Sequence, residues 1–167
     1  KLDIYLIEPN QVLGRANKFF LKFSKKIFCY AEKIKNFPNF FLDKIVTINP
    51  LIKKEIYELE IINKSQKRFD LLVVGGSQGA NIFDDNLKTS IVNISRKTKI
   101  RITQQTSENN IQDLKDFYSK NNLENSIFSF EKNFHKIVQQ ADLCITRAGA
   151  STLAELSFLN IPFIAVP

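Results

Sequence analysis

A glycine-rich turn follows a short apolar run and could bind an anion. Residues 71–74 are all apolar, and the sequence Gly75-Gly76-Ser77-Gln78-Gly79 separates them from a helical pattern. This order predicts a buried parallel strand over 70–75, a tight turn, and a helix over 79–94. Unpaired N–H groups and the positive end of the helix dipole at such a helix start favour a phosphate group. The alternative is a turn that only packs and caps the helix through Ser77.

The spacing of these glycines differs from two familiar nucleotide motifs. The turn is not Gly-x-Gly-x-x-Gly, and no Gly-Lys-Ser/Thr follows it. The chain therefore has neither the dinucleotide fingerprint nor a P-loop at this place. A dinucleotide-dependent oxidoreductase is disfavoured for this reason.

A second strand-to-helix turn brings an arginine and a carboxylate to the same edge of the predicted sheet. Strand 142–146 leads through residues 147–150 into another helix. The carboxyl ends of parallel strands meet at one edge, so this turn should face the same cleft as the glycine-rich turn. Arg147 could neutralise a phosphate or pair with a surface acid. Glu155 could complete a capping box with Thr152, or it could accept hydrogen bonds from the hydroxyls of a ribose.

The remaining reactive side chains form no recognisable site. His135 is the one histidine of the chain, and we expect it at an exposed polar position on a short helix. Cys29 and Cys144 lie far apart on predicted strands and are not spaced as metal ligands. Two buried thiols in a reducing compartment fit this pattern better than a disulfide does.

The composition is that of a folded protein with a sizeable core. The chain has 167 residues, of which 44% are apolar, enough for one medium domain or for two halves of a larger protein. No apolar run reaches transmembrane length, and the start does not resemble a signal peptide. The sequence begins at Lys1 within a predicted strand and ends at Pro167 after another, so we expect a segment of a longer protein.

Strands and helices alternate regularly in the second part of the chain, which predicts a parallel sheet with helices on both faces. The buried face of the first helix should carry Ala80, Phe83, Leu87, Ile91 and Ile94. The predicted strands are 70–75, 99–104, 126–130, 142–146 and 162–166, and the helices are 79–94, 108–121, a short helix with Phe134, Ile137 and Val138, and one from about Ser151.

The first part is predicted to hold strands over 2–7, 27–31 and 45–48, with Glu8 and Asn10 in the loop after the first. A helix over 14–27 would carry one stripe of Phe19, Phe20, Phe23 and Ile27 and another of Lys18, Lys22 and Lys25. Packing of the phenylalanines in the core, with a solvated lysine face, is one interpretation, and contact with anionic lipid is the other. Residues 51–69 are interpreted as a linker, with a domain boundary near residue 68.

Positive charge is concentrated in the first part of the chain. Residues 1–70 hold 14 Lys and Arg against 8 Asp and Glu, whereas residues 71–167 hold 10 against 9. The asymmetry favours an anionic membrane surface as partner, or it reflects a lysine-rich composition without function. No recognition helix, zinc spacing or aromatic RNA-binding signature accompanies the charge, so no nucleic-acid partner is expected.

Taken in order, these motifs resemble the MurG family of bacterial N-acetylglucosaminyltransferases. The similarity lies in Gly75–Ala80, in Arg147–Glu155, and in Glu8–Asn17, which is similar to the family's His-Glu-Gln-Asn loop and following Gly-x-x-Asn. Asn49-Pro50 resembles its Asn-Pro-x-Arg turn. The resemblance implies an α/β fold of parallel Rossmann-like sheets in the glycosyltransferase-B architecture, with both domains incomplete. Residues 1–68 would be the C-terminal part of the acceptor and membrane-side domain plus linker, and residues 69–167 the N-terminal part of the UDP-sugar donor-binding domain.

The resemblance also implies an activity and a set of contacts. The family transfers N-acetylglucosamine from UDP-N-acetylglucosamine to an undecaprenyl-linked muramyl-pentapeptide acceptor, converting lipid I to lipid II by direct inverting displacement without a metal cofactor. It acts peripherally at the cytoplasmic face of the bacterial inner membrane, against an anionic surface. By this resemblance Ser77 would contact the diphosphate, Glu155 would hold the ribose hydroxyls, and Asn10 would face the donor from the first domain. The catalytic base would precede Lys1. The other implied substrate-binding residues are Gly76, Gln78, Ala150, Ser151 and Thr152.

Four residues depart from the family pattern. Ile7 stands in place of histidine, Pro9 in place of glutamine, and Ile52 in place of arginine, although Lys53 is adjacent. Glu131 follows Phe130 where an apolar residue usually lies against the uracil. A remnant that retains the fold without binding or transferring a sugar is therefore the alternative to a working transferase.

Overall fold

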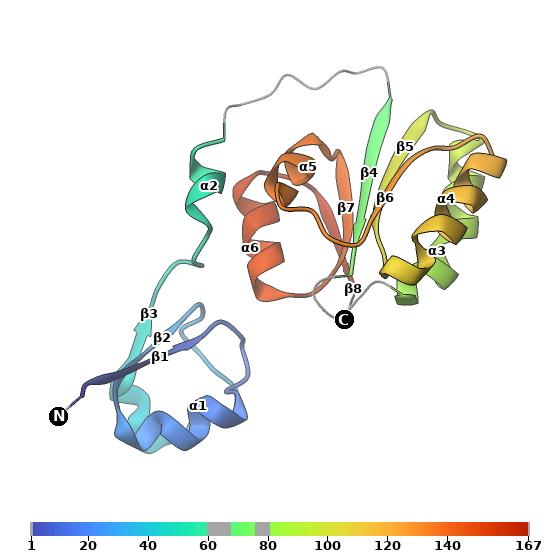
Figure 1. Ribbon diagram of the computed structural model, residues 1–167. Helices are drawn as coiled ribbons and strands as arrows, with labels where there is room; N and C mark the ends of the chain where they lie inside the picture. The colour runs from blue at the N-terminus through green and yellow to red at the C-terminus, as the bar shows by residue number, and fades with distance from the viewer. Residues whose placement is uncertain (1, 60–67, 76–80, 167) are drawn as a thin grey trace. The chain divides into compact units, whose positions relative to one another are not determined.

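The computed structural model describes residues 2–59, 68–75 and 81–166 (Figure 1). It divides into two compact units, Lys1–Leu51 and Ile52–Pro167. The sequence-based boundary near residue 68 lies later than this division. The short helix α2 (Lys54–Tyr57) belongs with the second unit, because Ile56 is buried and the Tyr57 ring lies 4.7 Å from the ring of Phe158, centroid to centroid.

The first unit is a three-stranded parallel sheet in the order β1-β2-β3. Its strands are β1 (Ile4–Glu8), β2 (Ser24–Cys29) and β3 (Ile45–Thr47), with helix α1 (Arg15–Phe20) and the 3₁₀ turns η1 (Leu21–Phe23) and η2 (Asn39–Lys44). The core of this unit is formed by β2, η1 and the loops after β1 and β2. Its buried residues are Leu13, Leu21, Ile27, Cys29 and Ile34.

The predicted helix over 14–27 is wrong in its second half. The α-helix ends at Phe20, and Ser24 already begins β2, where Ile27 pairs with both Leu6 and Ile45. Pairing on two sides outweighs the helical spacing of the phenylalanines, because a central strand satisfies its backbone through both neighbours. The Lys44 ammonium donates to the carbonyl oxygens of Leu21 and Ser24 and so fixes this transition.

The core-packing interpretation of the phenylalanine stripe is also wrong. Phe19, Phe20 and Phe23 are 63%, 46% and 56% exposed, and only Leu21 of this segment is buried. The Lys22 ammonium lies 4.6 Å from the centre of the Phe23 ring and 5.8 Å from that of Phe19. The segment therefore presents aromatic rings and lysines together on one exposed surface.

The second unit is a five-stranded, wholly parallel sheet in the order β6-β5-β4-β7-β8, which confirms the predicted α/β class. The strands are β4 (Phe69–Val74), β5 (Ile100–Gln105), β6 (Glu124–Phe128), β7 (Leu143–Arg147) and β8 (Phe163–Val166). The helices are α3 (Asn81–Ser95), α4 (Ile111–Lys120) after the 3₁₀ turn η3 (Glu108–Asn110), α5 (Phe134–Gln140) and α6 (Ala150–Phe158).

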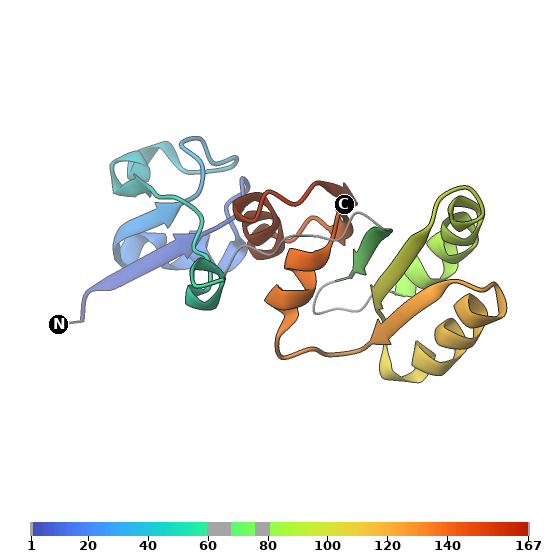
Figure 2. The same ribbon diagram turned by 90° about the horizontal axis from the view of Figure 1, so that it is seen from above.

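Helices cover both faces of this sheet (Figure 2). Leu71 and Val73 of β4 pack in a cluster with residues of α3 and α4, whereas Leu72 and Val74 pack with α5 and α6. The central strand is thus buried on both sides, as its unbroken apolar run predicts. The buried face of α3 carries Phe83, Ile91 and Val92. The expected Ile94 is wrong, because it is 52% exposed.

Within the residues that the structure describes, none of the helices has the length and apolar character needed to cross a bilayer.

Candidate functional site

The strand order of the second unit has its switch point between β4 and β7. From β4 the chain adds β5 and β6 on one side, and then crosses over to add β7 and β8 on the other. The helix after β4 covers one face of the sheet, and the helix after β7 covers the opposite face. Loops that diverge in this way leave an opening at the carboxyl ends of the strands, where α/β folds bind ligands.

Both turns singled out in the sequence leave the sheet at this place. Val74 and Thr146 are paired neighbours at the carboxyl ends of β4 and β7, and Gly75 is buried directly after Val74. The two turns therefore start from adjacent strands at one edge of the sheet. Gly76, Ser77 and Gln78 lie outside the described residues, so their contact with a diphosphate stays a prediction.

The start of α6 offers free backbone donors to this crevice. Gly149 is the N-cap with extended backbone angles, and no side chain caps the helix. The first helical hydrogen bond runs from the N–H of Leu153 to the carbonyl of Gly149, at 3.0 Å. The N–H groups of the three preceding helical residues, Ala150, Ser151 and Thr152, accordingly have no acceptor within the helix. They can donate to oxygen atoms of a ligand.

The capping-box interpretation of Glu155 is wrong. A capping box needs Thr152 at the N-cap, but Thr152 is the third residue of the helix and Gly149 holds the cap position. Glu155 lies two turns into the helix and is only 8% exposed. Among the described residues, none donates a hydrogen bond to its carboxylate. Its oxygens are not among the fully buried polar atoms that lack a partner, so hydroxyl groups of a bound molecule could donate to them.

A saturated carboxylate that the sequence analysis did not single out lies at the end of β1 in the first unit. Glu8 is the last residue of the strand, not part of the loop as predicted, and is 2% exposed. Its Oε1 accepts from the backbone N–H and the side-chain amide of Asn10, at 3.2 and 3.1 Å. Its Oε2 accepts from the N–H of Gly14 at 2.7 Å and the side-chain amide of Asn17 at 3.0 Å. Burial raises the pKa of Glu8, but these hydrogen bonds outweigh it and hold the pKa below the ordinary value.

A second buried carboxylate joins α3 to the end of β5. Asp84, in the first turn of α3, accepts from the side-chain amide of Gln104 at 2.8 Å, from the hydroxyl of Thr106, and from the side-chain amide of Asn110 at 3.1 Å. The Tyr118 hydroxyl donates to the other end of the Gln104 side chain at 2.8 Å. Burial and the nearby Asp84 carboxylate raise the pKa of Tyr118 above its ordinary value. This network fixes the helix that follows the glycine-rich turn.

The other side chains named in the sequence analysis do not form a site in the part of the chain that the structure describes. Arg147 is exposed, and His135 is partly exposed on α5. Cys29 and Cys144 are free and fully buried, as expected, and burial raises the pKa of the Cys144 thiol to about 12. Glu131 accepts the N–H of Asn133, the N-cap residue of α5, at 2.8 Å. The described residues contain no group of three or more potential metal ligands.

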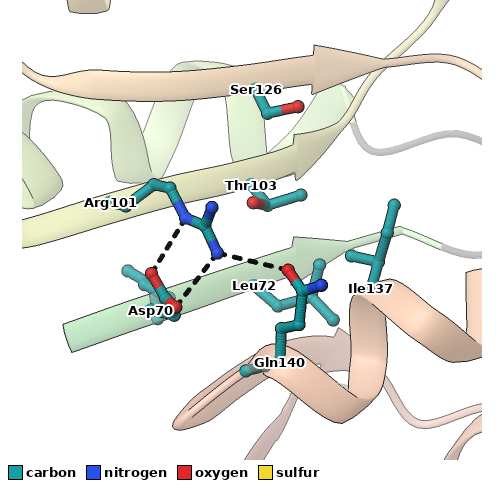
Figure 3. Close-up of a pocket in the computed structure, with 9 residues that line it drawn as sticks. Asp70, Leu72, Arg101, Thr103, Ser126, Ile137 and Gln140 are labelled. Atoms are coloured by element: carbon teal, nitrogen blue, oxygen red, sulfur yellow. Dashed lines mark hydrogen bonds and ion pairs between the residues drawn. The ribbon is translucent and has the colours of Figure 1, made fainter. Parts of the chain in front are cut away.

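A small pocket of about 110 Å³ lies on the sheet away from the carboxyl edge (Figure 3). It is lined by residues near the starts of β4 and β5 and by residues of β6 and α5. Arg101 donates to both oxygens of Asp70, at 2.9 and 3.0 Å, and to Gln140 at 3.3 Å. Since its charged groups pair with each other, this pocket is better explained as structural than as a ligand site.

Comparisons with known proteins point in the same direction as the geometry. Residues 70–167 match the family described as "Glycosyltransferase family 28 C-terminal domain". A curated protein of Pelagibacter ubique (strain HTCC1062), named UDP-N-acetylglucosamine--N-acetylmuramyl-(pentapeptide) pyrophosphoryl-undecaprenol N-acetylglucosamine transferase, is 46% identical over 166 residues, covering 99% of this chain and 47% of that protein. A protein of the same name from Rickettsia rickettsii (strain Sheila Smith) is 34% identical, covering 100% of this chain and 52% of that one. The chain thus spans about half the length of the curated relatives it matches.

Two solved structures share the fold. The crystal structure of Acinetobacter baumannii MurG matches with a TM-score of 0.72 at 23% identity, covering 99% of this chain and 46% of that one. The glycotransferase of kitacinnamycin matches with a TM-score of 0.57 at 13% identity, covering 86% and 36%. At these identities the likeness concerns the fold alone.

Proposed function

This chain belongs to glycosyltransferase family 28, and from that premise we propose that it is part of a transferase that moves N-acetylglucosamine from UDP-N-acetylglucosamine to a lipid-linked muramyl-pentapeptide. The product would be lipid II, made from lipid I in peptidoglycan synthesis. The names of the two curated relatives support this donor and acceptor. The observation that carries the proposal is the Glu155 carboxylate, nearly buried and without a donor, on the helix that opens the crevice between β4 and β7.

The proposed donor site is built around this crevice. Glu155 accepts hydrogen bonds from the ribose hydroxyls, and the free N–H groups at the start of α6 face the nucleotide. The glycine-rich turn, with Ser77, binds the diphosphate, and Asn10 faces the donor. The remaining proposed contacts are Gly76, Gln78, Ala150, Ser151 and Thr152.

The proposed chemistry is a direct inverting displacement at the anomeric carbon. Negative charge develops on the leaving diphosphate, and helix N–H groups stabilise such charge without solvent reorganisation. They would take the part that a metal ion plays in other sugar-nucleotide enzymes. By the resemblance, the catalytic base is not one of residues 1–167.

Calorimetric titration of this chain with UDP-N-acetylglucosamine tests the donor site. We expect saturable binding that excess EDTA does not abolish, and about tenfold weaker binding by Ser77→Ala, because a hydrogen bond to a charged phosphate is lost. Asp116→Asn, an exposed carboxylate on α4, is the matched control and should bind like the parent chain. A chain that does not bind the nucleotide at all would support the remnant interpretation instead.

We also propose that the first unit contacts an anionic membrane surface through Phe19, Phe20 and Phe23 with Lys18 and Lys22. These rings are exposed beside lysines, and aromatic residues next to cations suit the interface of a bilayer. The net positive charge of residues 1–70 adds attraction. By the resemblance, the membrane would be the bacterial inner membrane at its cytoplasmic face.

Co-sedimentation with vesicles tests this surface. Binding to vesicles that contain anionic lipid should exceed binding to zwitterionic vesicles, and it should fall as salt rises from low to physiological concentration. The double variant Phe19→Ser and Phe23→Ser should lose most of the binding. Phe40→Ser is the control, because Phe40 is even more exposed, at 86%, but lies on η2. Binding that is indifferent to lipid charge, or equally lowered by the control, contradicts the proposal.

A further inference from the structure

We propose that Glu8 is a positioning residue that fixes the side-chain amide of Asn10, so that the carbonyl oxygen of this amide turns away from the carboxylate and accepts a hydrogen bond from a hydroxyl or N–H group of the donor sugar. The inference rests on the proposed function, which places Asn10 against the donor. It adds which part of the donor Asn10 contacts, which atom of Asn10 is offered, and what holds that atom in place.

Glu8 can hold the amide in only one orientation. An ionised carboxylate is purely an acceptor, with room for about four hydrogen bonds on its two oxygens. Glu8 receives four, from two N–H groups of Asn10, one of Gly14 and one of Asn17. Turning the Asn10 amide over would set its Oδ1 against Oε1 of Glu8, two acceptors about 3 Å apart. The amide nitrogen therefore faces the carboxylate, and Oδ1 lies on the far side of the amide.

The neighbouring side chain of Asn17 is fixed in the same way. Its Nδ2 donates both to the carbonyl oxygen of Ile7, at 2.9 Å, and to Oε2 of Glu8, at 3.0 Å. Both of its N–H groups are used, so Asn17 cannot exchange places with Asn10 as a donor to the carboxylate. One buried charge thus sets two amides at the carboxyl end of β1.

Gly14 makes this close approach possible. A Cβ atom at position 14 would lie 3.1 Å from Oε2 of Glu8, closer than ordinary contacts allow. The backbone angles of Gly14 are those of an extended residue with negative φ, so conformational freedom does not require a glycine here. The absence of a side chain at position 14 leaves room for the Glu8 carboxylate, whose shortest hydrogen bond comes from the N–H of Gly14.

The exposed Asn10 is then suited to a polyol ligand. Asn10 is exposed, whereas Glu8 beneath it is buried. An acceptor held rigidly in place loses little conformational entropy on binding and favours donors such as sugar hydroxyls. A negatively charged ligand group gains nothing from this oxygen, so the contact contributes to binding of the sugar and not of the diphosphate.

Glu8→Gln tests the inference with two readouts. Glutamine has nearly the same shape but a single acceptor oxygen, so it cannot serve four donors, and its own N–H groups would turn the Asn10 amide over. We expect the affinity for UDP-N-acetylglucosamine to fall about tenfold while the affinity for UDP stays unchanged. The matched control is Asp3→Asn, a carboxyl-to-amide change at an exposed ion pair of the same unit, and it should alter neither affinity.

The second readout is the side-chain amide signal of Asn10 in ¹⁵N-¹H spectra, assigned by its loss in Asn10→Ala. We expect the signal to move strongly in Glu8→Gln and to stay in place in Asp3→Asn, since it reports the hydrogen bond to Glu8 directly. An Asn10 signal indifferent to Glu8→Gln, or an equal loss of UDP and UDP-N-acetylglucosamine affinity, overturns the inference. If the signal moves but the parent chain binds no UDP-sugar, the proposed function fails, and with it the assignment of Oδ1 to a sugar, while the amide orientation stands.

Discussion

Glu155→Ala is expected to lower the affinity for UDP about 30- to 150-fold without destabilising the free protein. Hydrogen bonds to a charged group contribute about 1.5–3 kcal/mol each, and loss of the contacts to a ribose should amount to about 2–3 kcal/mol. The free chain loses no hydrogen bond, because no described residue donates to this carboxylate. Removing a carboxylate that makes no hydrogen bond to a described residue should leave the free energy of unfolding nearly unchanged.

A loss of affinity for UDP together with an unchanged free energy of unfolding is expected of a residue that contacts the ligand and does not support the fold. Titration calorimetry gives the affinity, and chemical denaturation of the same samples gives the stability. A parallel titration with 2′-deoxyuridine diphosphate shows whether the ribose is the partner, because Glu155→Ala should bind the two nucleotides nearly alike. Asp116→Ala on α4 is the control for loss of a carboxylate. A variant that loses stability and keeps its affinity for UDP would assign Glu155 to the fold and end its role as a ribose ligand.

The architecture around this residue was largely accessible from the sequence. Unbroken apolar runs such as 71–74 locate buried parallel strands, and the regular alternation with helices sets the class of the second unit. Two turns that follow adjacent strands must then share an edge. The prediction of a helix over 14–27 was wrong. The phenylalanines have helical spacing, but Ile27 lies on a strand that pairs with two neighbouring strands. Strand pairing between distant segments is not visible in local periodicity.

The buried polar residues were the part that the sequence could not supply. Glu8 looks like a loop acid before a proline. Its carboxylate is satisfied because Gly14 and Asn17 bring one donor each, in addition to the two donors of Asn10. Asp84 looks like a solvated acid near a helix start, but its partners lie some twenty residues further along. The capping box at Thr152 was plausible by spacing and failed because the N-cap is Gly149, three residues before Thr152.

Asp84→Ala is expected to destabilise the second unit by about 3–4 kcal/mol. The substitution leaves the Gln104 amide and the Thr106 hydroxyl without acceptors, and both residues are almost completely buried. Each unsatisfied buried group costs about 1–3 kcal/mol, and water cannot easily replace the lost carboxylate. Hydrogen exchange of the amides of β5 measures this loss directly, since their protection reports the unfolding free energy of the strand that Asp84 holds.

Two further variants separate the network from general effects on α3. Asp85→Ala removes the next carboxylate of the same helix, whose side chain is 83% exposed and lies 3.6 Å from Lys88, and the protection of β5 should not change. Asp84→Asn should cost less than Asp84→Ala, because its amide can donate to Gln104 if that side chain turns over, and the Tyr118 hydroxyl can accept from the other end. Equal protection of β5 in Asp84→Ala and Asp85→Ala would mean that α3 is held by its apolar face alone. The carboxylate would then have no part in fixing the helix behind the glycine-rich turn.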